Sequence, residues 1–141
     1  MRVYLSGAIS DVSYAYANQW RAELKENIES LTKGHWKCFN PLEHYNYEIT
    51  PEYGYTEPEV MNYELGMLRN SDIVICRWDE NKSLGTACEL AIAYERRIPV
   101  LLLVTDEETF IHPWVEAMAD HVFKDKDTLI HYLISNYFNE V

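Results

Sequence analysis

Residues 72–104, DIVICRWDENKSLGTACELAIAYERRIPVLLLV, contain the pattern that decides the fold. Asp72–Arg77 and Pro99–Val104 are short apolar runs without polar alternation, which is typical of strands buried on both faces of a sheet. Leu84–Arg96, between them, has the length and composition of a helix, and Ser83 precedes its start, where a helix cap is favoured. A strand, a helix and a second strand in this order predict parallel strands joined by a covering helix.

The same alternation continues over the rest of the chain. Apolar residues recur at steps of four, four and three in the first helical segment, which gives it one apolar face. Further elements are predicted as strands at Arg2–Leu5, Trp36–Phe39 and His121–Lys124, and as helices at Tyr14–Lys33, Pro58–Arg69 and Thr128–Phe138. We therefore predict one α/β domain over residues 1–141, a three-layer αβα sandwich with a flavodoxin-like or Rossmann-like parallel sheet of about five strands.

Charge and composition limit the function. The 141 residues include 12 Lys and Arg against 23 Asp and Glu, a formal net charge of −11. This charge repels a nucleic-acid polymer or an acidic membrane surface, but a helix N-terminus can still hold one phosphate of a small nucleotide. Three cysteines without a CxxC motif indicate neither a disulfide framework nor a zinc site. Without a signal peptide or an apolar span, the protein is predicted to be cytoplasmic.

Glu89 is the first candidate catalytic residue. It falls within the first two turns of the 84–96 helix and is flanked by apolar residues. Because helical side chains lean toward the N-terminus, its carboxylate can point back toward the strand ends, where parallel sheets bind ligands. The spacing equally allows a solvent-facing side chain paired with Lys82 or Arg96.

Glu64 is the second candidate. It lies on the helix before the 72–77 strand, again among apolar and aromatic neighbours, although a surface glutamate would give the same pattern. Two carboxyl groups in one cleft are the minimum requirement for cleaving a glycosidic bond with retention. One attacks the anomeric carbon, and the other moves protons at the leaving group.

Two turns are candidate substrate-binding segments. Ser6 and Gly7 follow the first strand, and Ser83 with Gly85 opens the helix that contains Glu89. Exposed N–H groups at a helix start favour an anion or a sugar hydroxyl. Neither turn has the glycine spacing or the lysine of a phosphate-binding loop, and a tight turn alone accounts for a glycine.

The sequence resembles the nucleoside 2-deoxyribosyltransferase family. The matching stretches agree in order and spacing over almost the whole chain. They are VYLSGAI at 3–9, NYELGMLRNSDIVI at 62–75 and SLGTACELAIAYERRIPVLLL at 83–103. The resemblance implies a small deoxynucleoside or deoxynucleotide as substrate, with no cofactor and no metal.

Carried over by position, the resemblance implies a role for each candidate. Glu89 would be the nucleophile that forms a deoxyribosyl-enzyme, Glu64 would replace the family's usual Asp, and Tyr4 would orient the nucleophile or the sugar. His112 and Trp114 fall where the family sends residues into the neighbouring subunit's site, although neither is the usual residue there. The resemblance therefore implies a homodimer or a higher homo-oligomer.

Two departures leave the reaction open. Transferases of the family place Asp six residues before the nucleophile, whereas this chain has Ser83, like the related deoxynucleoside 5′-monophosphate N-glycosidases. Those hydrolases also have Arg in the first loop, and ISDVSYAY at 9–16 has none. We predict a nucleoside 2-deoxyribosyltransferase; the alternatives are a hydrolase with the same nucleophile and a non-catalytic nucleotide-sensing module. A flavin carrier is disfavoured, because the first loop is not rich in Ser or Thr.

The segment Pro41–Tyr55 shows no clean periodicity and is predicted to be a loop. Its His44, Tyr45 and Tyr47 could stack on the base of the substrate. The sequence equally allows a plain surface loop.

Overall fold

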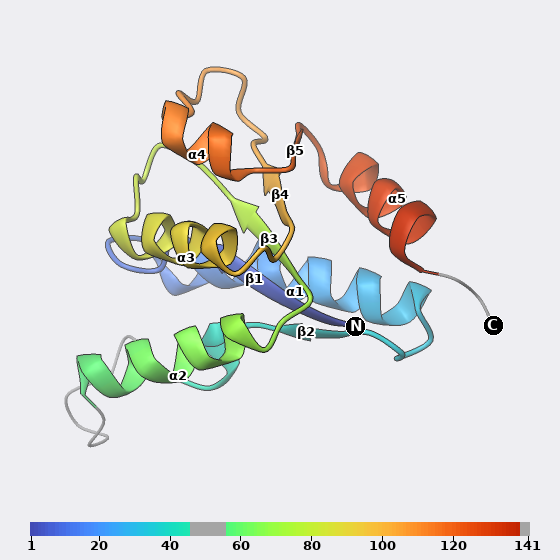
Figure 1. Ribbon diagram of the computed structural model, residues 1–141, viewed down its shortest axis with the longest axis horizontal. Helices are drawn as coiled ribbons and strands as arrows, with labels where there is room; N and C mark the ends of the chain where they lie inside the picture. The colour runs from blue at the N-terminus through green and yellow to red at the C-terminus, as the bar shows by residue number, and fades with distance from the viewer. Residues whose placement is uncertain (46–55, 139–141) are drawn as a thin grey trace.

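The computed structural model describes residues 1–45 and 56–138. Within these residues, parallel strands form one sheet in the order β2-β1-β3-β4-β5 (Figure 1). The strands are β1 (Arg2–Gly7), β2 (Lys37–Phe39), β3 (Ile73–Arg77), β4 (Val100–Leu103) and β5 (His121–Phe123). The predicted α/β class and the parallel five-stranded sheet are confirmed.

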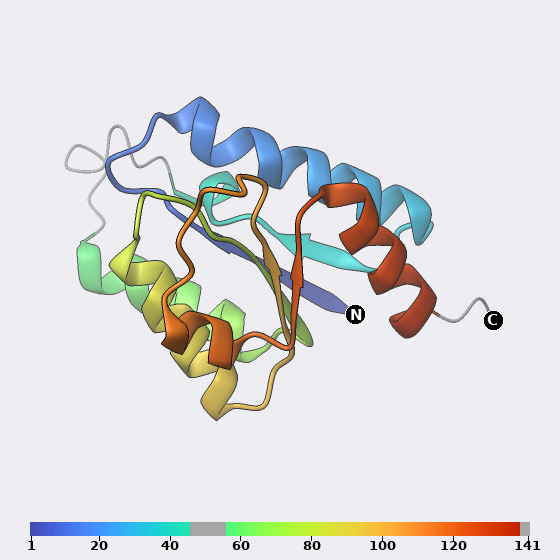
Figure 2. The same ribbon diagram turned by 90° about the horizontal axis from the view of Figure 1, so that it is seen from above.

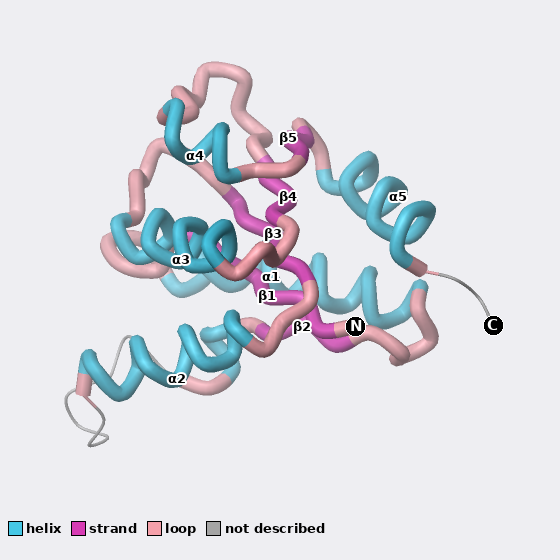
Figure 3. The backbone as a smooth tube through the Cα atoms, in the orientation of Figure 1, coloured by secondary structure: helices cyan, strands magenta, loops and turns pink. Residues whose placement is uncertain are grey.

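Helices cover both faces of the sheet. Their bounds are α1 (Tyr14–Leu31), α2 (Glu57–Arg69), α3 (Leu84–Glu95), α4 (Pro113–Met118) and α5 (Lys126–Tyr137), with a short 3-10 helix η1 (Pro41–Glu43) after β2. Figure 2 shows α1 and α5 on one side of the strands and α2, α3 and α4 on the other. The same arrangement is visible in the tube of Figure 3, and it is the predicted three-layer sandwich.

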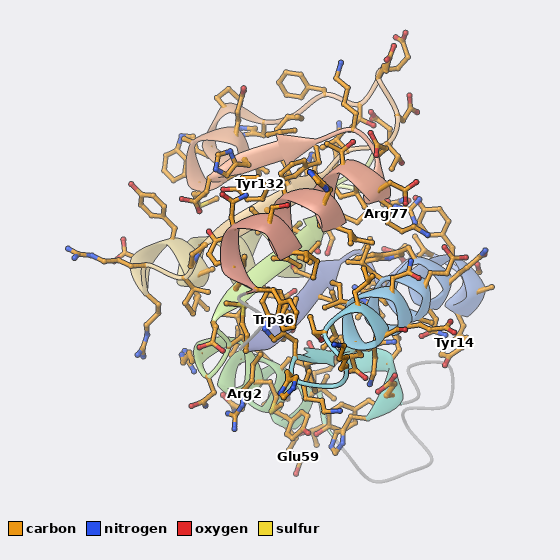
Figure 4. The ribbon with its side chains drawn as sticks, turned by 90° about the vertical axis from the view of Figure 1, so that its right-hand side faces the viewer. Arg2, Tyr14, Trp36, Glu59, Arg77 and Tyr132 are labelled. Carbon is orange, nitrogen blue, oxygen red and sulfur yellow. The ribbon has the colours of Figure 1, made fainter. Side chains whose placement is uncertain are left out.

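The alternation of side chains along β1 divides the core into two layers. Val3 and Leu5 pack in a cluster with Trp20 and other residues of α1 and α5. Tyr4 points to the opposite face and packs in a second cluster with Leu90 of α3. An aromatic contact joins the start of β2 to the end of α5. Trp36, which directly precedes β2 and is labelled in Figure 4, packs edge-on against Phe138.

Most predicted bounds shift by one or two residues, and three differences from the sequence prediction have a physical reason. β1 is two residues longer, because Ser6 and Gly7 continue the register against β3 instead of turning. α5 begins at Lys126, two residues early, because Asp125 caps it by accepting from Thr128 N at 2.7 Å. α4 was not predicted, since its six residues are too few to show a helical period.

The boundaries of α1 follow from local chemistry. The Ser13 hydroxyl accepts from Tyr16 N at 3.1 Å, so Ser13 is the cap of this helix. Gly34 has φ +78°, the left-handed conformation expected after a helix. No helix among the described residues is long and apolar enough to cross a membrane.

The strand order determines where a ligand can bind. The chain runs from β1 to β2 on one side and then returns to place β3 on the other side of β1. The connections therefore diverge between β1 and β3, and sheets of this type bind their ligands at the carboxyl ends of the strands at such a point. Ser6 and Gly7 of β1 lie at this topological switch point, paired with Cys76 and Arg77 of β3.

Gly7 is required by close packing. A Cβ atom there would lie 2.8 Å from the Trp20 ring and 3.3 Å from Arg21 Nη2. We expect Gly7→Ala to lower the free energy of unfolding by about 1–3 kcal/mol in urea denaturation. Gly66→Ala is the matched control: its Cβ would meet nothing within 4 Å in α2. That change should raise stability by about 0.5–1 kcal/mol, and equal effects of the two substitutions would contradict the packing argument.

Candidate active site

Glu89 faces the end of β1. Ser6 Oγ donates to Glu89 Oε1 at 3.3 Å, across 83 residues of sequence. The other oxygen, Oε2, is buried and has no hydrogen-bond partner among the described residues, and the same is true of the Tyr4 hydroxyl. The alternative of a solvent-facing carboxylate paired with Lys82 or Arg96 is therefore wrong.

The local structure of α3 explains this orientation. The Ser83 hydroxyl accepts from Thr86 N at 3.2 Å, so the helix begins at Leu84 and Glu89 falls in its second turn. Thr86 and Leu90 are buried against the sheet, and Glu89 lies beside them on the helix surface. The cap and the apolar face together aim the carboxylate at the switch point.

Burial dominates the electrostatics of both carboxyl groups. It raises the pKa of Glu89 to about 7, against the opposing effects of the Tyr4 hydroxyl, the Arg21 guanidinium and the Ser6 hydroxyl. Burial first, and then the charge of Glu89, raise the pKa of Glu64 to about 7, against the opposing effect of Arg21. The pKa of Tyr4 is raised by burial and then by the two carboxylates.

The dipole of α3 does not control the protonation of Glu89. The positive end of a helix favours an ionised carboxylate, but its influence is greatest in the first turn. Glu89 lies in the second turn, and burial raises its pKa instead. Near neutral pH the two carboxyl groups interact, so ionisation of one favours the protonated form of the other. That is the division of roles between a nucleophile and an acid.

Arg21 is the site residue that the sequence reasoning missed. Its side chain is fully buried, and it donates from Nε to Leu5 O at 3.2 Å and from Nη2 to Gly7 O at 2.8 Å. A third bond joins Nη1 to Ala17 O within α1. A signal was available: Ala17, Arg21, Leu24 and Ile28 follow steps of four, three and four, so an arginine lies within an apolar helical face.

Three predicted substrate-binding residues lie elsewhere. Ser83, His112 and Trp114 line a groove of about 770 Å³ between α3 and α4. Ala87 of α3 lines the same groove, and Glu89 is about 200° further around the helix. Within one chain, the groove and Glu89 therefore lie on opposite sides of α3.

The groove is apolar, and its rim is highly exposed. Trp114 is 76% and Leu84 80% exposed, and Phe110 and Tyr94 are also exposed. His112 caps α4, with its Nδ1 accepting from Trp114 N at 3.2 Å. Exposed apolar area of this kind on one surface is typical of an interaction site.

Gly7 and Gly85 differ in their surroundings. Gly7 lies at the end of β1 against Trp20 and Arg21, whereas a Cβ at Gly85 would meet only Ser83 Oγ, at 3.9 Å. Gly85 is exposed in the first turn of α3. Close packing therefore explains Gly7 without a ligand, and Gly85 is open to one.

A polar cluster joins the first turn of α1 to the loop after β3. Tyr16 Oη donates to Asp79 Oδ2 at 2.6 Å, and Asn81 Nδ2 donates to Tyr16 Oη at 3.4 Å. The guanidinium of Arg77, labelled in Figure 4, lies 4.7 Å from the centre of the Tyr16 ring. The first loop has no arginine in its sequence, but β3 brings one beside it.

Aromatic rings extend from Tyr4 toward α2. Tyr4 stacks on Phe39 at 5.4 Å, Phe39 contacts Tyr63 at 5.9 Å, and Tyr63 stacks on His44 at 4.0 Å. His44 and Tyr45 are thus in contact with the helix that contains Glu64. Tyr47 lies outside the described residues.

The described residues contain no group of three or more His, Cys, Asp or Glu that could hold a metal ion. The site consists of two carboxyl groups, two hydroxyl groups and one buried guanidinium at the carboxyl edge of a parallel sheet. This combination of fold and site is typical of α/β proteins that bind a small molecule at a topological switch point.

The chain belongs to the nucleoside 2-deoxyribosyltransferase family, whose model matches residues 3–132. Members of this family act on small nucleosides or nucleotides as N-glycosidic-bond transferases or glycosidases. The resemblance noted in the sequence is therefore confirmed. No curated protein sequence matches the chain significantly.

Solved structures share the fold. A conserved protein from Enterococcus faecalis V583 has a TM-score of 0.81 at 19% identity, over 95% of this chain and 97% of that one. A 2-deoxyribosyltransferase from Bacillus psychrosaccharolyticus has a TM-score of 0.72 at 21% identity, over 94% and 92%. The CMP N-glycosidase BcmB from Clostridium botulinum has a TM-score of 0.61 at 14% identity, over 94% and 97%.

The raised pKa of Glu89 predicts that its charge destabilises the fold. Between the ordinary value of 4.5 and about 7, the folded chain keeps a proton that the unfolded chain loses. Stability due to this group therefore falls as the pH rises through that window. In denaturant unfolding, we compare the free energy of unfolding of Glu89→Gln with that of wild type. This difference should be about 2 kcal/mol more favourable to the variant at pH 8 than at pH 5.

The control for this experiment is Glu57→Gln, which changes an exposed glutamate in the first turn of α2. Its effect should be nearly the same at the two pH values. A Glu89→Gln effect that is equally independent of pH would contradict the burial of the carboxylate.

Proposed function

We propose that the protein cleaves the N-glycosidic bond of 2′-deoxynucleosides and passes the sugar to another base, with Glu89 as the nucleophile. The observation that supports this most directly is the Glu89 carboxylate at the switch point. One of its oxygens accepts from Ser6, and the other is buried without a partner among the described residues. Such an atom is costly unless a ligand uses it.

In the first step, Glu89 attacks C1′ of the deoxyribose, and the bond from C1′ to the base nitrogen breaks. The electron pair of that bond leaves with the base, which takes a proton from the Glu64 carboxyl group. The raised pKa of Glu64 supports this role, because the group can hold a proton near neutral pH. The product is an ester between Glu89 and the sugar.

In the second step, a nitrogen of an incoming base attacks C1′ and releases the Glu89 carboxylate. The ionised Glu64 accepts the proton that the incoming base loses. Tyr4, whose buried hydroxyl is close enough to lower the pKa of Glu89, orients the nucleophile. Ser6 shares this role through its hydrogen bond. The rings near Glu64, including Tyr63 and His44, offer a surface for the base.

A hydrolase is the second candidate, with water as the acceptor in place of a base. One observation favours a 5′-phosphate substrate for it: the cationic side chain of Arg77, at the end of β3, lies beside Tyr16 at the start of α1. A nucleotide-sensing module without turnover is the third. Two carboxyl groups that can serve as nucleophile and acid near neutral pH argue against a sensor without turnover.

We further propose that the groove between α3 and α4 binds a second copy of the chain. The groove is bordered by the protruding apolar side chains of Trp114 and Leu84. These side chains could fill the same groove on a second copy. A two-fold dimer requires such a self-complementary patch. His112, Trp114 and Ser83 would then act at the interface and not in their own chain's Glu89 site.

Activity is tested with a panel of deoxynucleosides and their 5′-monophosphates, followed by chromatography of free and exchanged bases. Glu89→Ala should lower turnover by about 10³-fold or more while the fold survives. A slow 2-fluoro substrate analogue should leave a covalent adduct on Glu89, detected by peptide mass spectrometry.

The control is Glu57→Ala, which removes an exposed carboxylate from α2 and should keep full activity. Base exchange only with an acceptor present indicates the transferase, and base release without one indicates the hydrolase. Wild-type activity in Glu89→Ala would refute the nucleophile, and a lack of turnover and of adduct on the whole panel would favour the sensor.

The assembly is tested by light scattering after size-exclusion chromatography. We expect wild type to have the mass of a dimer or a larger oligomer and Trp114→Asp to be a monomer, since a carboxylate in an apolar interface is not paired. Leu31→Asp, at a 53% exposed leucine of α1 away from the groove, should leave the mass unchanged. A monomeric wild type would contradict the interface.

A further inference from the structure

Arg21 is a buried cation whose position the proposed chemistry does not itself explain. It is fully buried in the α1 layer, with its guanidinium 4.6 Å from the centre of the Trp20 ring. No carboxylate lies within salt-bridge distance of it among the ion pairs of the described residues. Its bonds go to main-chain carbonyl groups instead, so its purpose must be found in the backbone that it binds.

The register of the sheet explains these bonds. Lys37 N donates to Met1 O at 2.9 Å, so carbonyls of odd-numbered residues in β1 point toward β2. The pairing of β1 with β2 ends at Tyr4 and Phe39. Two residues further, the same register would bring Pro41 to the Leu5 carbonyl, and proline has no N–H to donate. Arg21 supplies donors where β2 cannot.

The two carbonyls that Arg21 binds lie on either side of Ser6. Nε donates to Leu5 O and Nη2 donates to Gly7 O, so the guanidinium holds the carbonyl groups of the two residues on either side of Ser6. The Ser6 side chain points to the other face of the sheet and donates to Glu89. A rigid planar fork on one face thus fixes the orientation of a donor on the other.

The charge of Arg21 acts on the same carboxyl groups. Arg21 lowers the pKa of both Glu89 and Glu64, against the effect of burial. The other titratable groups that face Glu89 are Tyr4 from β1 and Cys76 from β3, and both have raised pKa values. Arg21 is therefore the cation among these groups that favours the ionised nucleophile.

The geometry points to Arg21 as the positioning residue of the active site. It holds the backbone on either side of Ser6, and it places a buried positive charge at the end of β1, beside the Glu89 site. This inference rests on the proposed function for its catalytic meaning. The clamp and the charge are properties of the folded chain, and they can be measured without a substrate.

The test is a titration of the Glu89 carboxyl carbon by NMR in protein with ¹³C-labelled glutamate, assigned with Glu89→Gln. Arg21→Gln removes the charge but keeps a side-chain amide that can bind a carbonyl. We expect it to raise the pKa of Glu89 by about one unit. Arg21→Lys keeps a cation but loses the fork, and its shift should be smaller.

The matched control is Arg77→Gln, which removes another cation from the carboxyl edge of the sheet, beside Tyr16. It should leave the Glu89 titration unchanged. In the proposed reaction, the pH below which kcat/KM falls should shift with the pKa of Glu89. The kcat/KM of Arg21→Gln should then be about tenfold below that of wild type at pH 6 and close to that of wild type at pH 9.

An unchanged Glu89 titration in a folded Arg21→Gln protein would overturn the inference, whatever happened to its melting temperature. If that variant does not fold, Arg21→Met, which also removes the charge, decides in its place: a raised Glu89 pKa supports the inference, and an unchanged one overturns it. Shifted titrations in a protein that cleaves no glycosidic bond would refute the proposed function and leave the positioning role intact.

Discussion

The structure depends on the last three residues of β1, because elements from both faces of the sheet are fixed to them. Arg21 of α1 holds the carbonyls of Leu5 and Gly7, and Ser6 between them holds Glu89 of α3. Residue 7 must be glycine, because the Trp20 ring and the Arg21 guanidinium occupy the space of a side chain there. A short stretch of main chain thus connects a cation on one side of the sheet to a nucleophile candidate on the other.

The chemistry of the site follows from a balance between burial and charge. Burial alone would protonate both glutamates, whereas a strong ion pair would leave both ionised. Arg21 acts at a distance greater than that of a salt bridge, so its effect is partial and both pKa values remain near neutral. Two carboxyl groups held in this range can exchange the roles of acid and base, which a glycosidic-bond transfer requires in its two steps.

α3 serves two surfaces at once. Its sheet-facing side holds Glu89 over β1, while its other side forms an apolar groove with α4. Residues on opposite sides of one helix cannot reach a common ligand within a single chain. The exposed rim of Trp114 and Leu84 supports the proposed second chain at this groove.

Hydrophobic periodicity and capping residues act within a few residues, so the strands and most helices can be predicted from the sequence alone. The sequence also singled out Glu89, Glu64, Tyr4 and Ser6, but not Arg21 or the contacts among these residues. That Ser6 meets Glu89 and that Arg21 binds the carbonyls on either side of Ser6 follows from the tertiary structure. These contacts depend on strand order and on the end of β2 at Phe39, before Pro41. A contact between residues 83 positions apart has no local period, and α4 is too short to have one.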